Sequence, residues 1–398
     1  MKKNLKSYFC CCMTIIGFVS CSQQEMQLST DVKKVEDVIS IQEASEIARV
    51  HYQQVFGTKE SRSADFKLAD YETIRFKSTR SSENQSSNLA YYVLNFDNDE
   101  GFAIVSALKD DNTVYAVSNE GHLHLSDTLQ NPSLSWYIND YLQYAYTSDK
   151  GIVKNDSTVV TPPVESVIIS PCQPLLKGFM TQFNQRSPYN KYCYTVSGEQ
   201  AVIGCVPLAV GTLMGYHGWP QNIEDYKLDM NEMQSDSQND GWKRLFEVIG
   251  RKQYLNANYG VNQTSVKADS EFVARIINKL GYKNAKGGNF DVNTIYPQLS
   301  SNRLVLIGGM CSAGGHMWIL DGGYILKRTY ISTEPDYQLS YYLHCIWGWN
   351  GTNNGYFLLQ KDDMIGGISV KPDSDKPISP TQYLFGDLKI VYDFIPNK

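Results

Sequence analysis

The sequence predicts an α+β protein in which a small α+β domain precedes a larger one, and three observations support this. Residues 41–148 combine amphipathic helical segments with short strand-like runs. Residues 149–170 are polar and contain Pro162-Pro163, which is typical of a linker. Residues 171–398 place helical patterns first and strand patterns later, which indicates an α+β domain with a helical half and an antiparallel β half.

The first residues are typical of a bacterial export signal. A basic start, which includes Lys2-Lys3, is followed by an apolar stretch over residues 8–19. Ser20 and then Cys21 follow this stretch, in the manner of a lipoprotein processing site. Residues 1–21 are therefore predicted to be a lipoprotein signal peptide with Cys21 lipidated. An ordinary signal peptide or a membrane anchor is the alternative, although the apolar run is short for a membrane span.

Charge and cysteine content restrict the classes of function. The chain of 398 residues carries a net charge of −6 and has no basic stripe, so nucleic acid is not expected as a partner. Five of the nine cysteines lie beyond the export segment, at positions 172, 193, 205, 311 and 345. An odd number predicts at least one free thiol and leaves pairing among the others open. No cysteine or histidine cluster has zinc-site spacing, so no metal or organic cofactor is expected.

The first domain is expected after a polar tether at residues 22–40. A helix is predicted over residues 41–56, because apolar residues recur there at helical spacing and Gly57 follows as a stop signal. The other predicted elements are a strand near residues 69–76, a hairpin of strands 89–96 and 101–106, a strand over 114–117 and a helix over 132–146. Together they make the small α+β domain of residues 41–148.

The second domain, residues 171–398, is expected to place its helices before its strands. The predicted helices span residues 206–217, 241–249 and 270–280, and the predicted strands span residues 304–307, 316–321, 341–347 and 356–359. The boundary between two such halves is a natural place for a substrate cleft. Polar residues expected at this boundary are therefore candidates for chemistry.

Cys205 is the predicted nucleophile. It stands in Gly204-Cys205-Val206-Pro207, at the start of the predicted helix over residues 206–217. Unpaired N–H groups and the helix dipole stabilise a thiolate at such a position, and Pro207 suits a first helical turn. The alternative is an inert core cysteine, which is common for a free cysteine.

His316 is the predicted base. It follows a glycine pair at the start of a predicted strand, where its side chain would face the cleft. An imidazole beside Cys205 can hold the thiol proton and leave a thiolate as the nucleophile. A satisfied core histidine is the alternative, and His344 is a weaker candidate for the base. His217 ends the predicted helix and is expected to be structural, with a partial charge favoured by the dipole.

Two further residues are expected to support this pair. Trp347, in Trp347-Gly348-Trp349, is predicted to shield the histidine from water, although a hydrophobic turn would also explain the run. The oxyanion of acyl transfer needs a donor, and Gln200 has an amide N–H whereas ionised Glu199 has none. Gln200 is therefore preferred as the donor, with the backbone N–H of Cys205 as the second one.

These motifs together resemble the streptopain-type cysteine peptidases, a streptococcal and Bacteroidetes branch of the papain-like fold. The resemblance rests on Gly204-Cys205-Val206, on Gly315-His316 and on the segment from His344 to Trp349. Residues 40–148 resemble the inhibitory propeptide of that family. The resemblance implies a two-lobed papain-like catalytic domain with Cys205 as nucleophile, His316 as base and Trp347 over the site. It also implies a zymogen that is activated by proteolysis in or near residues 149–172.

The sequence departs from the family pattern at three places. Pro207-Leu208-Ala209 stands where the family usually has small residues, Ile346 stands where it often has Asn, and Glu199 falls on the position of the oxyanion glutamine. An isoleucine cannot hydrogen-bond an imidazole. The group that orients His316 is therefore left open by the sequence.

The predicted function is a secreted zymogen of a cysteine endopeptidase that hydrolyses protein or peptide substrates through a thioester. The propeptide is the expected intramolecular inhibitor. The precursor is expected in the cell envelope, held to a membrane by lipid on Cys21, with release of the catalytic domain after cleavage. One alternative is a catalytically degenerate surface lipoprotein that binds peptides or host proteins, suggested by Ile346 and Glu199. A second is an acyltransferase or amidase, which shares the thioester chemistry.

Overall fold

The computed structural model of the chain describes residues 38–57, 67–77, 87–109, 111–151, 165–267, 269–311, 314–330, 336–365 and 388–398. The export signal, the lipidation site at Cys21 and most of the predicted tether lie outside these residues. None of the helices within these ranges has the length and apolar character needed to cross a bilayer.

The helices of the described ranges group into those before and those after the predicted linker. The first group is α1 (Ile41–Phe56), η1 (Asp97–Asp99), η2 (Leu125–Leu129), α2 (Pro132–Ser135), η3 (Trp136–Tyr141) and α3 (Leu142–Gly151). The second group is η4 (Gly178–Gln182), α4 (Cys205–His217), α5 (Met230–Ser235), α6 (Asp240–Gly250), α7 (Ser270–Lys279) and α8 (Val292–Ser300).

The longer strands belong to one large sheet. They are β1 (Leu68–Lys77), β2 (Ser87–Phe96), β3 (Phe102–Ser106), β4 (Val114–Ser118), β5 (Glu165–Cys172), β11 (Lys286–Asn289), β12 (Val305–Cys311), β13 (Gly314–Tyr330), β14 (Asp336–Ile346), β15 (Gly355–Ile365) and β16 (Lys389–Tyr392). Six short strands form separate two-stranded pairs: β6 (Thr195–Val196), β7 (Glu199–Gln200), β8 (Asn222–Ile223), β9 (Tyr226–Lys227), β10 (Tyr282–Lys283) and β17 (Ile395–Pro396). The predicted α+β class is confirmed.

Helix α1 begins and ends where its sequence signals predict. The Ser40 side chain accepts a hydrogen bond from the N–H of Glu43, and the Glu43 carboxylate accepts one from the N–H of Ser40, which makes a capping box. Gly57 ends the helix with a φ of 77°, a value that favours glycine. Its buried face carries Ala44, Ala48 and His51.

The helix predicted over residues 132–146 is divided into three parts. Asn131 caps α2 through a bond to the N–H of Leu134, and Pro132 stands in the first turn. Residues Trp136–Tyr141 then adopt a π-helical turn before α3 begins. The aromatic side chains of η3 face the strands of the second domain, where Trp136 contacts Trp318 and Tyr137 contacts Phe357.

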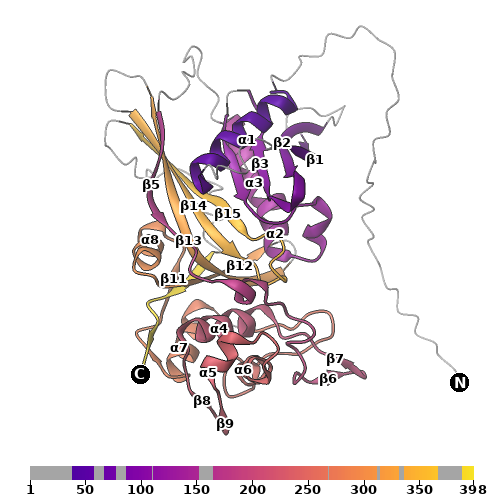
Figure 1. The fold of residues 1–398 in the computed structure, drawn as a ribbon, viewed down its shortest axis with the longest axis vertical. Helices are drawn as coiled ribbons and strands as arrows, with labels where there is room; N and C mark the ends of the chain where they lie inside the picture. Colours follow the sequence, from indigo (N-terminus) through magenta and orange to yellow (C-terminus); the bar gives the residue numbers. More distant parts are fainter. Residues whose placement is uncertain are drawn as a thin grey trace, which may run out of the picture. The chain divides into compact units, whose positions relative to one another are not determined.

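The sheet crosses from the first domain into the second. Its order is β1-β2-β3-β4-β15-β14-β13-β12-β16-β11, with β5 paired to β13. Strand β4 of the first domain pairs antiparallel with β15 through Val117 opposite Tyr356 and Ala116 opposite Phe357. Figure 1 shows the two sets of strands meeting at this edge, with α4 to α7 gathered in the helical lobe. Residues 165–170, assigned to the linker from sequence, lie in β5 and so belong to the sheet.

Two apolar cores hold the structure together. One contains α1, β2, β3, β4 and η3 of the first domain together with β13, β14 and β15 of the second. The other contains α4, α6 and α7 with the facing side chains of β12 and β13. In the second core, Gly215 of α4 lies against Trp242 of α6, where an added Cβ would stand only 2.2 Å from the indole. The first domain thus packs against the β half, and the candidate nucleophile helix is the centre of the helical half.

Candidate active site

Cys205 is the first residue of α4, as predicted. Gly204 precedes it with a φ of 93° and ψ of 146°, a conformation that residues with a side chain rarely adopt. This turn brings the chain into the helix with the thiol at its N-terminus, where backbone N–H groups favour a thiolate. The helix behind it is almost entirely buried.

His316 of β13 lies against Cys205, so the structure brings together the two residues that the sequence pairs. The imidazole and the sulfur are hydrogen-bonded. His316 is only 7% exposed. Because Nε2 contacts the backbone carbonyl of Trp347 at 3.3 Å, Nδ1 is the ring nitrogen left for the sulfur.

The pair is tuned toward thiolate and imidazolium. Burial raises the pKa of the Cys205 thiol, but the charge of His316, its hydrogen bond and the N–H groups of Met317 and Val206 outweigh burial and hold this pKa below its usual value. Burial also lowers the pKa of His316, yet the sulfur and the carbonyl of Trp347 together raise it above its usual value. The opposite directions favour the charged pair more than two isolated groups would.

The backbone carbonyl of Trp347 occupies the orienting position that the sequence left open. It accepts from Nε2 of His316 and so fixes the ring in place of a side-chain amide. Ile346 cannot fill that role, because its side chain has no hydrogen-bonding group. It lines a small apolar cavity of about 10 Å³ together with Cys205 and Leu208. A backbone carbonyl has no residue signature, so sequence analysis had no signal for it.

The two tryptophans have different positions. Trp347 is buried, with its indole N–H bonded to the carbonyl of Asn353 at 2.9 Å. Trp349 stacks on the imidazole of His316, with ring centroids 6.0 Å apart and an angle of 24° between planes. The ring that covers His316 is thus Trp349, whereas the sequence analysis assigned this shielding to Trp347.

Gln200 is not placed as predicted. It lies in the exposed strand β7, and its amide Nε2 donates to the backbone carbonyl of Cys193. Glu199, its neighbour in β7, is exposed as well. Because both side chains belong to the exposed hairpin of β6 and β7, neither is placed to donate to the oxyanion. The backbone N–H of Cys205 is then the remaining predicted donor.

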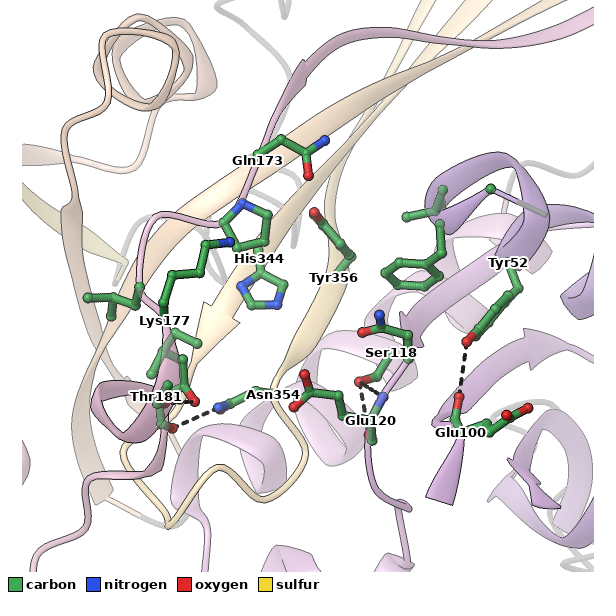
Figure 2. A pocket seen from close by; sticks show the side chains of 18 of the residues that line it. Tyr52, Glu100, Ser118, Glu120, Gln173, Lys177, Thr181, His344, Asn354 and Tyr356 are labelled. Atoms are coloured by element: carbon green, nitrogen blue, oxygen red, sulfur yellow. Dashed lines mark hydrogen bonds between the residues drawn. The ribbon is translucent and has the colours of Figure 1, made fainter. Parts of the chain in front are cut away.

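His344, the weaker candidate for the base, is held elsewhere. Its Nδ1 lies 2.6 Å from the carboxylate of Asp321, which is fully buried and also accepts the N–H of Leu176 at 3.0 Å. Figure 2 shows His344 facing a cavity of about 570 Å³ between the two domains, across from Glu120. This cavity is separate from the small cavity that Cys205 lines, and Ile346 lines both.

His217 is structural, as expected, but its predicted partial charge is wrong. Its Nδ1 lies 3.2 Å from the hydroxyl of Tyr282. Burial, assisted by the charge of Lys398, lowers the pKa of His217 to about 4. The loss of hydration therefore outweighs the helix dipole, and the ring is neutral at pH 7.

Four of the cysteines beyond the export segment lie in described parts of the chain with described side chains, and all four are free thiols. Cys172, Cys193 and Cys345 are buried, and burial raises the pKa of each. Cys205 is partly exposed, and its pKa alone among the four is lowered. Reactivity is thus concentrated at one sulfur.

The first domain contacts the second around the histidine strand. The Tyr137 hydroxyl donates to the carbonyl of Leu358 at 3.0 Å, and the Tyr342 hydroxyl donates to that of Val114 at 2.6 Å. Trp136 and Trp318 have ring centroids 6.0 Å apart. Since Trp318 follows His316 closely in β13, the first domain packs on the element that carries the imidazole.

A thiol at a helix N-terminus, paired with an imidazole from the facing β half, is the arrangement of a cysteine-dependent acyl-transfer enzyme of papain-like fold. Here a second domain shares the sheet and core of the β half.

Comparison with known proteins assigns the family. Residues 183–285 and 229–357 match the Peptidase C10 family, and residues 36–145 match the Spi protease inhibitor. Residues 183–357 therefore carry the Peptidase C10 match of a cysteine peptidase, and the first domain carries the match to a propeptide of the Spi inhibitor type. The streptopain resemblance is thereby confirmed.

Two curated relatives and one solved structure agree with this assignment. Streptopain of Streptococcus pyogenes serotype M1 is 24% identical over 314 residues, which are 65% of this chain and 71% of streptopain. The thiol protease/hemagglutinin PrtT of Porphyromonas gingivalis is 24% identical over 218 residues, which are 44% of this chain and 23% of PrtT. A Prevotella intermedia prointerpain A fragment has a TM-score of 0.53 at 16% identity and covers 80% of this chain and 98% of the fragment. That last likeness supports the fold.

Proposed function

We propose that the chain is the exported zymogen of a cysteine endopeptidase in which Cys205 is the nucleophile and His316 the general acid and base. The observation that carries the proposal is the hydrogen-bonded pair of these residues, with the pKa of the thiol lowered and that of the imidazole raised. A thiolate that is already formed at neutral pH needs no further base to attack a peptide carbonyl.

The proposed reaction has two steps. The Cys205 thiolate attacks the peptide carbonyl carbon, a C–S bond forms, and the C–N bond breaks as the His316 imidazolium gives its proton to the leaving amine. The imidazole then takes a proton from water, the hydroxide adds to the thioester, and the C–S bond breaks to restore thiolate and imidazolium. The N–H of Cys205 is the proposed donor to the oxyanion in both steps.

Latency follows from the packing of the first domain on the β half. The domain buries side chains of β13, β14 and β15 in a shared core and lies on the strand of His316. Cleavage of the linker is expected before Glu165, because β5 starts there and pairs with β13. A cut inside β5 would remove an edge strand from the mature enzyme.

Export and anchoring remain proposals from the sequence. The basic start, the apolar run and Cys21 support a lipid-anchored precursor in the cell envelope. With the lipid on the propeptide side, cleavage in the linker would free the catalytic domain unless it stays bound to the propeptide.

Labelling with a peptidyl chloromethyl ketone tests the nucleophile directly. The full chain, cut in the linker by an added protease, is expected to take up one equivalent at Cys205. Cys205→Ala is expected to take up none, and His316→Gln to react far more slowly. Cys193→Ala is the matched control, because burial raises the pKa of that thiol to about 12. Equal labelling of wild type and Cys205→Ala would rule out the proposal and favour the peptide-binding alternative.

A further inference from the structure

We infer that Thr264 is a positioning residue for the nucleophile, because its side chain fixes the backbone turn that presents Cys205 at the start of α4. The inference rests on the proposed function, since it concerns the geometry of the same thiol. Thr264 lies far along the chain from Cys205, in the loop between α6 and α7.

One loop binds both backbone groups of Val202, three residues before the nucleophile. The buried hydroxyl of Thr264 donates to the Val202 carbonyl at 2.6 Å. The Val202 N–H donates to the carbonyl of Gly260 at 3.0 Å. The N–H of Gly260 in turn donates to the Thr264 hydroxyl at 3.2 Å, which orients the hydroxyl toward Val202.

The methyl group of Thr264 acts at a second point of the same turn. Gly204 has its φ of 93°, and a Cβ built there would lie 3.1 Å from Cγ2 of Thr264. The methyl group therefore packs against Gly204 on the side where a side chain would point. The loop that carries Thr264 is itself closed by two bonds between Asn258 and Ser265, at 2.8 and 3.1 Å.

These contacts bear on chemistry because Val202 and Gly204 set the direction in which the chain enters α4. The entry direction places both the sulfur and the N–H of Cys205 relative to His316. A displacement of about 1 Å in such a pair can cost on the order of 100-fold in rate. The hydroxyl holds the Val202 carbonyl and the methyl holds Gly204, so the two parts of one side chain can be tested separately.

The experiment compares Thr264→Val, which keeps the methyl and loses the hydroxyl, with Thr264→Ser, which keeps the hydroxyl. Each full chain is cut in the linker and assayed on a fluorogenic peptide. The pH profile of iodoacetamide alkylation is measured in parallel. Thr264→Val is expected to lose about tenfold in kcat with little change in KM. Its alkylation profile should move to higher pH, because the thiolate loses part of its support.

The other variants complete the test. Thr264→Ser is expected to stay within about threefold of wild type in kcat and to keep the wild-type profile. Thr294→Val is the matched control, because it removes a similar hydroxyl that bonds Asp291 at 2.8 Å at the start of α8. Thermal unfolding establishes that each variant is folded. If Thr264→Val does not fold, Thr264→Ala replaces it, since the space left allows water to reach the Val202 carbonyl.

The outcomes separate this inference from the proposed function. A wild type without Cys205-dependent activity contradicts the proposed function. An active wild type with an equally active Thr264→Val, or with a variant whose alkylation profile is unchanged, contradicts the positioning role and leaves the proposed function intact.

Discussion

The side chains of Cys205 and His316 titrate as one unit. Each group increases the population of the other's charged form, because the thiolate stabilises the imidazolium and the imidazolium stabilises the thiolate. Two macroscopic pKa values then belong to the pair. The carbonyl of Trp347 adds to this by accepting a hydrogen bond from Nε2, which favours the protonated ring.

The first prediction concerns pH. The alkylation rate of Cys205 should rise at a lower pH than that of an ordinary thiol, whose pKa is about 8.5, because the pKa of Cys205 is lowered. Peptidase activity should fall on the alkaline side as His316 loses its proton at a raised pKa. Iodoacetamide rates and kcat/KM measured over pH 4–10 check both limbs. An alkylation rate that rises only with an ordinary thiol pKa contradicts the ion pair.

The second prediction concerns Ile346, which is 3% exposed. Replacing it with Asn restores the residue type that the family often has at this position, yet no gain in kcat is expected, because the Trp347 carbonyl already contacts the imidazole. The buried amide should cost about 1–3 kcal/mol of unfolding free energy. Ile346→Val is the matched control. A rise in kcat for Ile346→Asn alone would contradict the orienting role of the carbonyl.

Residue types explain which parts of the site the sequence could predict. Cys205 and His316 carry chemistry in their side chains and stand in recognisable motifs. The orienting carbonyl of Trp347 and the N–H of Met317 are backbone groups, which every residue has. The sequence favours Gln200 only through its amide, but in the hairpin of β6 and β7 that amide donates to the carbonyl of Cys193.

Helices and strands match their predicted ranges where the sequence marks their ends clearly. Helix α1 matches its predicted range because Ser40 and Gly57 mark its ends. Helix α8 was missed because Pro297 lies inside it and a proline usually breaks a helix. Strand β11 was missed because two of its four residues are glycines, at 287 and 288, which weaken strand patterns.

His51 makes helix α1 sensitive to acid. Its Nε2 lies 2.7 Å from the hydroxyl of Tyr324, its ring lies 5.2 Å from that of Tyr342, and the side chain is 5% exposed. Arg328 of β13 is fixed nearby by bonds to Thr113 and Asn112, both at 3.1 Å. Burial, and then the charge of Arg328, lower the pKa of His51 to about 3.

The third prediction follows from the sign of this shift. Once the domain detaches, His51 regains an ordinary pKa of about 6.5. Its neutral form therefore stabilises the attached domain fully above pH 6.5, and this stability is lost as pH falls from 6.5 toward 3. Between pH 7 and pH 5 the loss is about 2 kcal/mol.

Gel filtration of the linker-cut Cys205→Ala protein measures the effect. The fraction of free propeptide should increase from pH 7 to pH 5. His51→Gln should respond much less, because it has no ring to protonate, and His124→Gln is the matched control on a partly exposed histidine. The same pH response in His51→Gln as in wild type would contradict the role of His51.

Strand pairing between residues far apart in the sequence joins the two domains. The sequence predicted two domains in order, but it had no signal that β4 would pair with β15 or that one core would run through both. Such contacts join residues more than 200 positions apart, and nothing local to Val117 or Tyr356 specifies them. The shared sheet and core explain how the first domain stays attached to the β half of the second.

The fourth prediction tests the shared core. Trp136 is buried against Trp318 and Tyr141, so Trp136→Ala should weaken the attachment of the propeptide by about 3–5 kcal/mol. The uncut precursor should then label with the chloromethyl ketone faster than wild type does. Tyr71→Ala is the matched control, since Tyr71 is 51% exposed on β1. Circular dichroism distinguishes a detached but folded propeptide from an unfolded protein. Equal labelling of wild type and Trp136→Ala would contradict the role of Trp136 in attaching the propeptide.

Chain length and casein digestion, followed together for wild type and Cys205→Ala under reducing conditions, test the proposed peptidase most directly. Wild type is predicted to shorten to a fragment that begins before Glu165 and to digest denatured casein, while Cys205→Ala stays full length and inert. A wild type that remains inactive even after an added protease has cut the linker would contradict the central claim that Cys205 and His316 form a working peptidase site.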